Sequence, residues 1–156
     1  MSSPRAGDPA PDFTLAGTPG GRRYTLSDLR GQVVVLVFYP GDDSIVCTEQ
    51  LVNYSTDLLQ FADLGAEVLG ISPQDVASHE QFAARHDLGF PLLADTDKKV
   101  GRLFELVGPL GFYKRSVFVV DAEGIVRYAH RSSHGLTYRP TSELVAAVRE
   151  AGASNG

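Results

Sequence analysis

The chain contains one cysteine, Cys47, and the residues around it in the sequence could make it a nucleophile. A thiol attacks well only as the thiolate, whose formation is favoured by a helix N-terminus and by a nearby cation. A hydroxyl residue, Ser44, and a proline, Pro40, precede it in the same segment. A lone cysteine can close neither an intramolecular disulfide nor the usual zinc site, so we expect either a reactive thiol or an inert buried one.

The segments on either side of Cys47 predict how it is positioned. Residues 33–39 form a continuous run of aliphatic and aromatic side chains, which predicts a strand buried on both faces of a partly parallel sheet. Apolar residues then recur at helical spacing as far as Gly65, a predicted C-terminal cap, so one helix begins near Cys47. Active sites of open α/β folds gather at the carboxyl ends of strands, and this position therefore favours a functional role.

The rest of the chain alternates between predicted strands and helices. We expect an N-terminal hairpin of strands at 12–15 and 23–26, further strands at 67–71, 90–93, 116–120 and 125–130, and helices at 75–86, 98–104 and 142–151. This alternation indicates an α/β sandwich with a central mixed sheet flanked by helices. With no linker or composition shift, residues 1–156 are expected to form a single domain, with 1–6 and 152–156 flexible.

Several motifs occur in an order that points to a known family. Pro40, Ser44 and Cys47 follow the pattern Pro, three residues, Ser or Thr, two residues and Cys, and Arg115 stands directly before the strand segment 116–121. Three segments match the same family in residue type and in order along the chain: 116–121, FPLLAD at 90–95 and GDPAPDF at 7–13. Over nearly the whole chain the sequence resembles the peroxiredoxin (AhpC/TSA) family, and most of all its bacterioferritin-comigratory, or Q-type, subgroup. The resemblance implies a thioredoxin-like fold and a thiol-dependent peroxidase.

The resemblance also implies roles for individual residues. Cys47 would be the peroxidatic nucleophile, Ser44 a hydroxyl that hydrogen-bonds the peroxide, and Arg115 the cation that stabilises thiolate and transition state. Pro40 would shape the pocket and exclude water, and Gln50 would support the arginine. These roles are chemically sensible, because breaking an O–O bond leaves negative charge on the departing oxygen, where preorganised donors lower the barrier.

The chain departs from the subgroup at two positions. Members often carry a resolving cysteine five residues after the peroxidatic one, where this sequence has Val52. A sulfenic acid on Cys47 would therefore be reduced by an external thiol, either thioredoxin, glutaredoxin or a small thiol, or by Cys47 of a second molecule. Ser44 replaces the commoner threonine and keeps the hydroxyl.

Composition excludes several classes of partner and cofactor. The net charge of -5 and the scattered Lys and Arg residues argue against nucleic acid binding, and no apolar run is long enough to cross a bilayer. We expect no cofactor and no metal, and the four histidines (His79, His86, His130 and His134) are predicted to be solvated surface residues. With no leader-like N-terminus, we expect a cytoplasmic protein, a monomer or weak homodimer whose substrate is a hydroperoxide.

Two other readings of Cys47 stay open. It could serve as the acyl acceptor of a Cys/His hydrolase, although no nucleophile-elbow glycine pattern surrounds it. Alternatively, the chain could be a non-catalytic thioredoxin-fold binding or chaperone module in which Cys47 only packs in the core. Alkylation kinetics distinguish the last reading, because a packing thiol stays inert at neutral pH.

Overall fold

The computed structural model describes residues 4–42, 44–132 and 138–154. Its strands are β1 (Thr14–Gly17), β2 (Arg22–Thr25), β3 (Val33–Phe38), β4 (Ala66–Ser72), β5 (Leu92–Ala94), β6 (Ser116–Val120) and β7 (Val126–Arg131). Its helices are η1 (Leu26–Leu29), α1 (Ile45–Thr56), α2 (Leu58–Ala62), α3 (Val76–His86), α4 (Lys99–Leu103) and α5 (Thr141–Ser154).

The seven strands form one sheet in the order β2-β1-β5-β4-β3-β6-β7. The central strands β3, β4 and β5 are parallel, whereas β1, β2, β6 and β7 pair antiparallel with their neighbours. Strand β3 lies between β4 and β6, and all six of its residues are buried, as the apolar run predicts. The α/β sandwich with a mixed sheet and an N-terminal hairpin is therefore confirmed.

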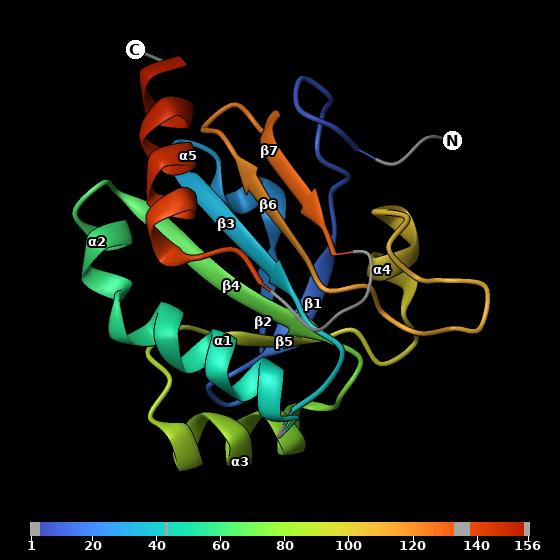
Figure 1. The fold of residues 1–156 in the computed structure, drawn as a ribbon. Coiled ribbons are helices and arrows are strands. Elements are labelled where there is room, and N and C mark those ends of the chain that lie inside the picture. Colours follow the sequence, from blue (N-terminus) through green and yellow to red (C-terminus); the bar gives the residue numbers. More distant parts are fainter. Residues whose placement is uncertain (1–3, 43, 133–137, 155–156) are drawn as a thin grey trace.

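Alternate residues of β3 supply the two layers of the core. Val33, Val35 and Val37 pack with side chains of α1, α2, α3 and α5 on one face, and Val34, Leu36 and Phe38 pack with α4 and the N-terminal segment on the other. Figure 1 shows α1 and α5 in front of the sheet, α2 on the left and α4 on the right. This two-layer burial fixes the end of β3, from which the chain leaves toward Cys47.

The helix predicted from Cys47 to Gly65 is interrupted. α1 ends at Thr56 and α2 starts at Leu58, with Asp57 between them at φ -93° and ψ 13°. The break falls where Ser55, Thr56 and Asp57 follow one another, and these residue types propagate a helix poorly. Gly65 ends the segment at φ +71°, as predicted for a capping glycine.

The two ends of the chain have defined contacts in the described part. The Pro4 carbonyl accepts a hydrogen bond from Arg131 at 2.8 Å, and α5 continues to Ser154, beyond its predicted end at 151. The expected flexibility of 1–6 and 152–156 falls partly on residues outside the description and stays a prediction. No helix in the described ranges has the length and apolar character that a bilayer crossing requires.

Candidate active site

Cys47 and Arg115 come together at the carboxyl end of β3. Cys47 lies in the first turn of α1, and Arg115 directly precedes β6, whose Ser116 pairs with Phe38 at the end of β3. The antiparallel register therefore brings Arg115 to the edge from which the chain leaves for α1. Arg115 Nη2 donates to Cys47 Sγ at 3.1 Å, and the two residues are 4% and 0% exposed.

A second contact holds the guanidinium from the side of α1. Gln50, one turn after Cys47 and fully buried, accepts from Arg115 Nη1 at 2.5 Å through Oε1. Its amide nitrogen donates to the hydroxyl of Tyr54 at 3.4 Å, which in turn donates to the carbonyl of Arg139 at 2.5 Å. Burial raises the pKa of Tyr54 to about 12, so its hydroxyl keeps its proton at neutral pH. Arg115 is thus positioned by groups other than the sulfur.

Ser44 caps the helix that carries the nucleophile. Its Oγ accepts from the backbone N–H of Cys47 at 3.2 Å, and its extended backbone (φ -71°, ψ 148°) is typical of an N-cap. Ser44 is exposed, as is Pro40, two residues after the end of β3. The side chain of Ser44 therefore contacts the backbone of Cys47. Contact of Ser44 or Pro40 with a bound peroxide stays a prediction.

This arrangement has the properties that nucleophilic sulfur chemistry needs. A guanidinium donor on Sγ and the N-terminal end of α1 both stabilise negative charge on sulfur. Because the groups are buried, their electrostatic effect is weakly screened by water. Gln50 fixes the guanidinium of Arg115, so a charge that develops beside Cys47 meets a preorganised donor.

The prediction that the histidines are solvated is wrong for His79. Its side chain is fully buried in α3, with Nδ1 2.8 Å from Asp42 Oδ2 and Nε2 2.9 Å from the Leu93 carbonyl. Although burial alone would raise the pKa of Asp42, hydrogen bonds from His79, Ser78 and Tyr39 hold that pKa below its ordinary value. The sequence contained one signal of this burial, because His79 precedes Phe82 by three residues and both share the inner face of α3.

The other histidines differ in exposure from the prediction or lie outside the description. His86 is half-buried and packs edge-on against Phe82, with ring centroids 5.1 Å apart. His130 is also half-buried, and burial lowers its pKa. His134 belongs to the residues that the structure does not describe. Across the described ranges, no group of three His, Cys, Asp or Glu side chains is arranged to hold a metal ion.

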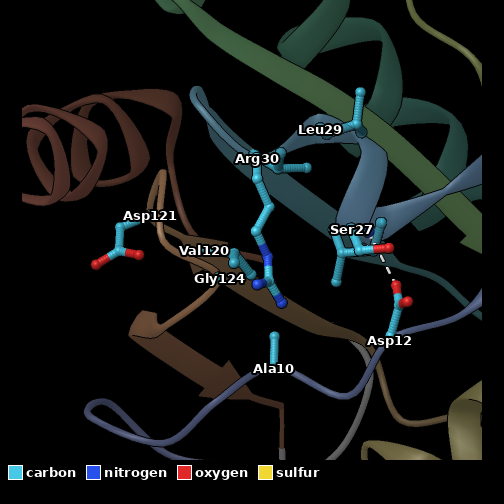
Figure 2. Close-up of a pocket in the computed structure, with 10 residues that line it drawn as sticks. Ala10, Asp12, Ser27, Leu29, Arg30, Val120, Asp121 and Gly124 are labelled. Atoms are coloured by element: carbon cyan, nitrogen blue, oxygen red, sulfur yellow. Dashed lines mark hydrogen bonds between the residues drawn. The ribbon is translucent and has the colours of Figure 1, made fainter.

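A separate small cavity lies at the opposite end of the central strands, beside the start of β3 and the end of β6. It has a volume of about 10 Å³ and is lined by residues that include Asp12, Ser27, Arg30 and Gly124 (Figure 2). The guanidinium of Arg30 covers Gly124, where an added Cβ would come within 2.8 Å of Arg30 Nε, and the Ser27 N–H donates to Asp12 at 2.9 Å. The space holds about one water molecule and is too small for a substrate.

The sequence matches a known family and several named proteins. Residues 6–129 match the AhpC/TSA family. Chloroplastic peroxiredoxin Q of Oryza sativa is 38% identical over 130 residues, which cover 81% of this chain and 58% of the rice protein. A peroxiredoxin of Thermoplasma volcanium is 37% identical over 131 residues, covering 78% and 63% of the two chains. The chain thus spans less than two thirds of the length of these relatives.

Solved structures agree with the sequence comparison. The peroxidoxin BcpB of Mycobacterium tuberculosis superposes with a TM-score of 0.85 at 29% identity, covering 94% of this chain and 97% of that one. The bacterioferritin comigratory protein of Xanthomonas campestris, which has been studied for its alkyl peroxide reduction activity, gives 0.82 at 28% identity, with 90% and 92% covered. The similarity therefore includes almost the whole length of both solved chains.

Proposed function

The chain belongs to the AhpC/TSA family, and from that premise we propose that it is a one-cysteine thiol peroxidase that reduces hydrogen peroxide and organic hydroperoxides. The observation that carries the proposal is the 3.1 Å contact between Arg115 Nη2 and the sulfur of the chain's only cysteine, Cys47. A buried cysteine that merely packs needs no cation beside its sulfur.

The first step is a displacement at oxygen. The Cys47 thiolate attacks the terminal oxygen of the hydroperoxide, so that an S–O bond forms while the O–O bond breaks. Sulfur loses two electrons and becomes a sulfenic acid, and the peroxide leaves as an alkoxide or hydroxide that takes up a proton. Arg115 stabilises the thiolate before attack and the negative charge that spreads onto oxygen during it.

The second step requires a thiol from outside the chain. An external thiol attacks the sulfenic sulfur and releases water, which leaves a mixed disulfide on Cys47. A second external thiol then restores the Cys47 thiolate and departs as a disulfide. We propose a thioredoxin-type protein, a glutaredoxin or a small thiol in this role, since the sequence has no second cysteine.

Stopped-flow mixing of reduced protein with hydrogen peroxide tests the proposal. We expect sulfenic acid to form on Cys47 far faster than on free cysteine, with one equivalent of peroxide consumed, as read by mass spectrometry. The Cys47→Ser variant is the control and should consume none. A wild-type rate equal to that of free cysteine would refute the peroxidase.

The full burial of Cys47 favours a second candidate, a binding or chaperone module with an inert thiol. In that case the folded protein would resist iodoacetamide at neutral pH and react only on unfolding. The cytoplasmic location and the monomer or weak homodimer also remain proposals, the former supported by the free cysteine, which suits a reducing compartment.

A further inference from the structure

Asp42 is held from three sides at the start of the loop that leads to Cys47. It lies two residues after Pro40 and five before Cys47, and its side chain is 1% exposed. The hydroxyl of Tyr39, at the end of the preceding segment, donates to Oδ1 at 2.7 Å. From α3, the Ser78 hydroxyl donates to Oδ2 at 2.7 Å, and His79 Nδ1 lies 2.8 Å from the same oxygen.

The backbone of the same residue is also fixed. The N–H of Asp42 donates to Gln74 Oε1 at 2.6 Å, across the connection between β4 and α3. Gly41 leaves the room for this contact, since a Cβ there would come within 2.9 Å of the same oxygen. The departure point of the loop is therefore joined to α3 and its leading turn by backbone and side chain together.

The ring of His79 contacts two separate elements. Nδ1 faces the carboxylate of Asp42, and Nε2 faces the carbonyl of Leu93 in β5, so both ring nitrogens meet oxygen acceptors. The ring therefore links the carboxylate that precedes α1 to the backbone of β5. Because both contacts are buried, losing either one is costly.

We propose that the buried Asp42–His79 pair is a positioning device for the nucleophile, which sets both the alignment of Cys47 with Arg115 and the access of external thiols to its sulfur. The inference rests on the proposed function for its catalytic part. Since Cys47 is fully buried, a thiol larger than peroxide reaches the sulfur only after the start of α1 moves. The pair resists that movement because it ties the preceding loop to α3 and β5.

The pair therefore has opposite effects on the two half-reactions. Attack on a small peroxide needs the closed arrangement, in which Arg115 contacts the sulfur. Reduction of the sulfenic acid by a bulky thiol needs the open one. Loosening the pair should slow the first and speed the second, a split that general loss of stability would not produce.

Asp42→Asn and His79→Gln test this, with Asp121→Asn as the matched control. Asp121 is a buried carboxylate directly after β6, at the opposite end of the central strands, where it accepts from Arg127 Nε at 2.6 Å. For the two test variants we expect peroxide attack to slow by about tenfold or more, because misplacement of reacting groups is costly. Reduction of the preformed sulfenic acid by a protein dithiol should quicken, and the control should change neither step.

Two readouts that involve no peroxide separate this proposal from the peroxidase itself. Amide hydrogen exchange at Cys47 and its alkylation by a bulky maleimide should both be faster in Asp42→Asn and His79→Gln than in Asp121→Asn. If wild-type protein does not react with peroxide, but exchange and alkylation are still faster in the two test variants, the proposed peroxidase activity is wrong and the positioning role stands. Unchanged exchange and alkylation, or equal slowing of both half-reactions, would overturn it. Should the test variants not fold, Ser78→Ala, which removes one donor to Asp42, should give the same split with smaller changes.

Discussion

Arg115 Nη2 lies 3.1 Å from Cys47 Sγ although 68 residues separate the two in the sequence. The contact depends on the pairing of β6 with β3, which brings the residue before β6 beside the start of α1. Gln50 binds the other terminal nitrogen of the same guanidinium, so its orientation does not depend on the charge of the sulfur. A donor fixed in this way stabilises the transition state without first being reorganised.

Replacing Arg115 should therefore slow peroxide attack. Arg115→Ala removes the donor on the sulfur, and we expect the second-order rate constant to fall by about 10²–10³, the usual cost of losing such a group. Arg115→Lys keeps the charge but cannot bond Cys47 and Gln50 with one planar fork, so it should give an intermediate rate. Stopped-flow measurement over a range of pH checks both variants, and a rate in Arg115→Ala equal to wild type would remove the assigned role.

Ser44 should contribute to stability through its cap. Ser44→Ala loses the acceptor for the Cys47 N–H, which we expect to lower the free energy of unfolding by about 1 kcal/mol. Ser44→Thr and Ser44→Asp keep an acceptor and should retain most of that stability in urea titrations. A hydroxyl that also binds peroxide predicts more: Ser44→Thr should stay active, whereas Ser44→Asp should be slow because its carboxylate has no proton to donate to the peroxide. Equal rates in the two variants would leave Ser44 a cap alone.

The buried tyrosines predict loss of stability at alkaline pH. Burial raises the pKa of Tyr54 from 10.0 to about 12 and that of Tyr39 well above its ordinary value. Above pH 10 the unfolded chain ionises these hydroxyls while the folded chain does not, so the stability that they support is complete below pH 10 and is lost as the pH rises toward 12. For Tyr54 we expect a loss of about 1 kcal/mol at pH 11.

Urea unfolding between pH 8 and 11 measures this dependence. Tyr54→Phe is the control, because it removes one titrating hydroxyl while keeping the ring in the core, and its curve should be flatter. It also removes the donor to the Arg139 carbonyl, so its stability at pH 8 should be lower than that of wild type. Identical slopes for the two proteins would show that Tyr54 is not responsible.

The parts of this fold that sequence could predict are those with a strong local pattern. β3 follows from an uninterrupted apolar run, and the start of α1 follows from Ser44, a good capping residue, before a helical spacing of apolar residues. Gln50, expected to support the arginine, does bond to it. For β3 and the start of α1 the residues that decide the structure lie within a few positions of one another, whereas the Gln50–Arg115 contact joins residues 65 positions apart and follows only from the family resemblance.

What sequence could not predict depends on packing between distant segments. The polar pair of Asp42 and His79 forms only because α3 lies against the loop after β3. No residue close to His79 in the sequence indicates that Asp42 is its partner. The role of Tyr54 is similar, since its apolar spacing indicated a core position while its hydroxyl reaches Arg139, 85 residues away. The helix break at Asp57 is a third case, where three weak local preferences outweighed a regular apolar spacing.

The place of Val52 predicts what an added resolving cysteine would require. Val52 lies on α1 beside an open groove of about 470 Å³ lined also by Ile45, Thr48, Glu49, Asn53 and His86, whereas Cys47 faces the core. Positions five apart on a helix are turned about 140° from each other, with Cα atoms roughly 8–9 Å apart. A disulfide needs less than about 7 Å, so it cannot form while α1 is intact.

In Val52→Cys, oxidation by one equivalent of peroxide should therefore produce an intramolecular disulfide together with loss of helical circular dichroism. Wild-type protein should keep its helical signal when Cys47 becomes a sulfenic acid, because no new bond pulls on α1. The double variant Cys47→Ser/Val52→Cys, which cannot close the bridge, should also keep it. A disulfide detected by mass spectrometry with the helical signal unchanged would mean that residues 47 and 52 approach each other without unwinding, contrary to the helix described here.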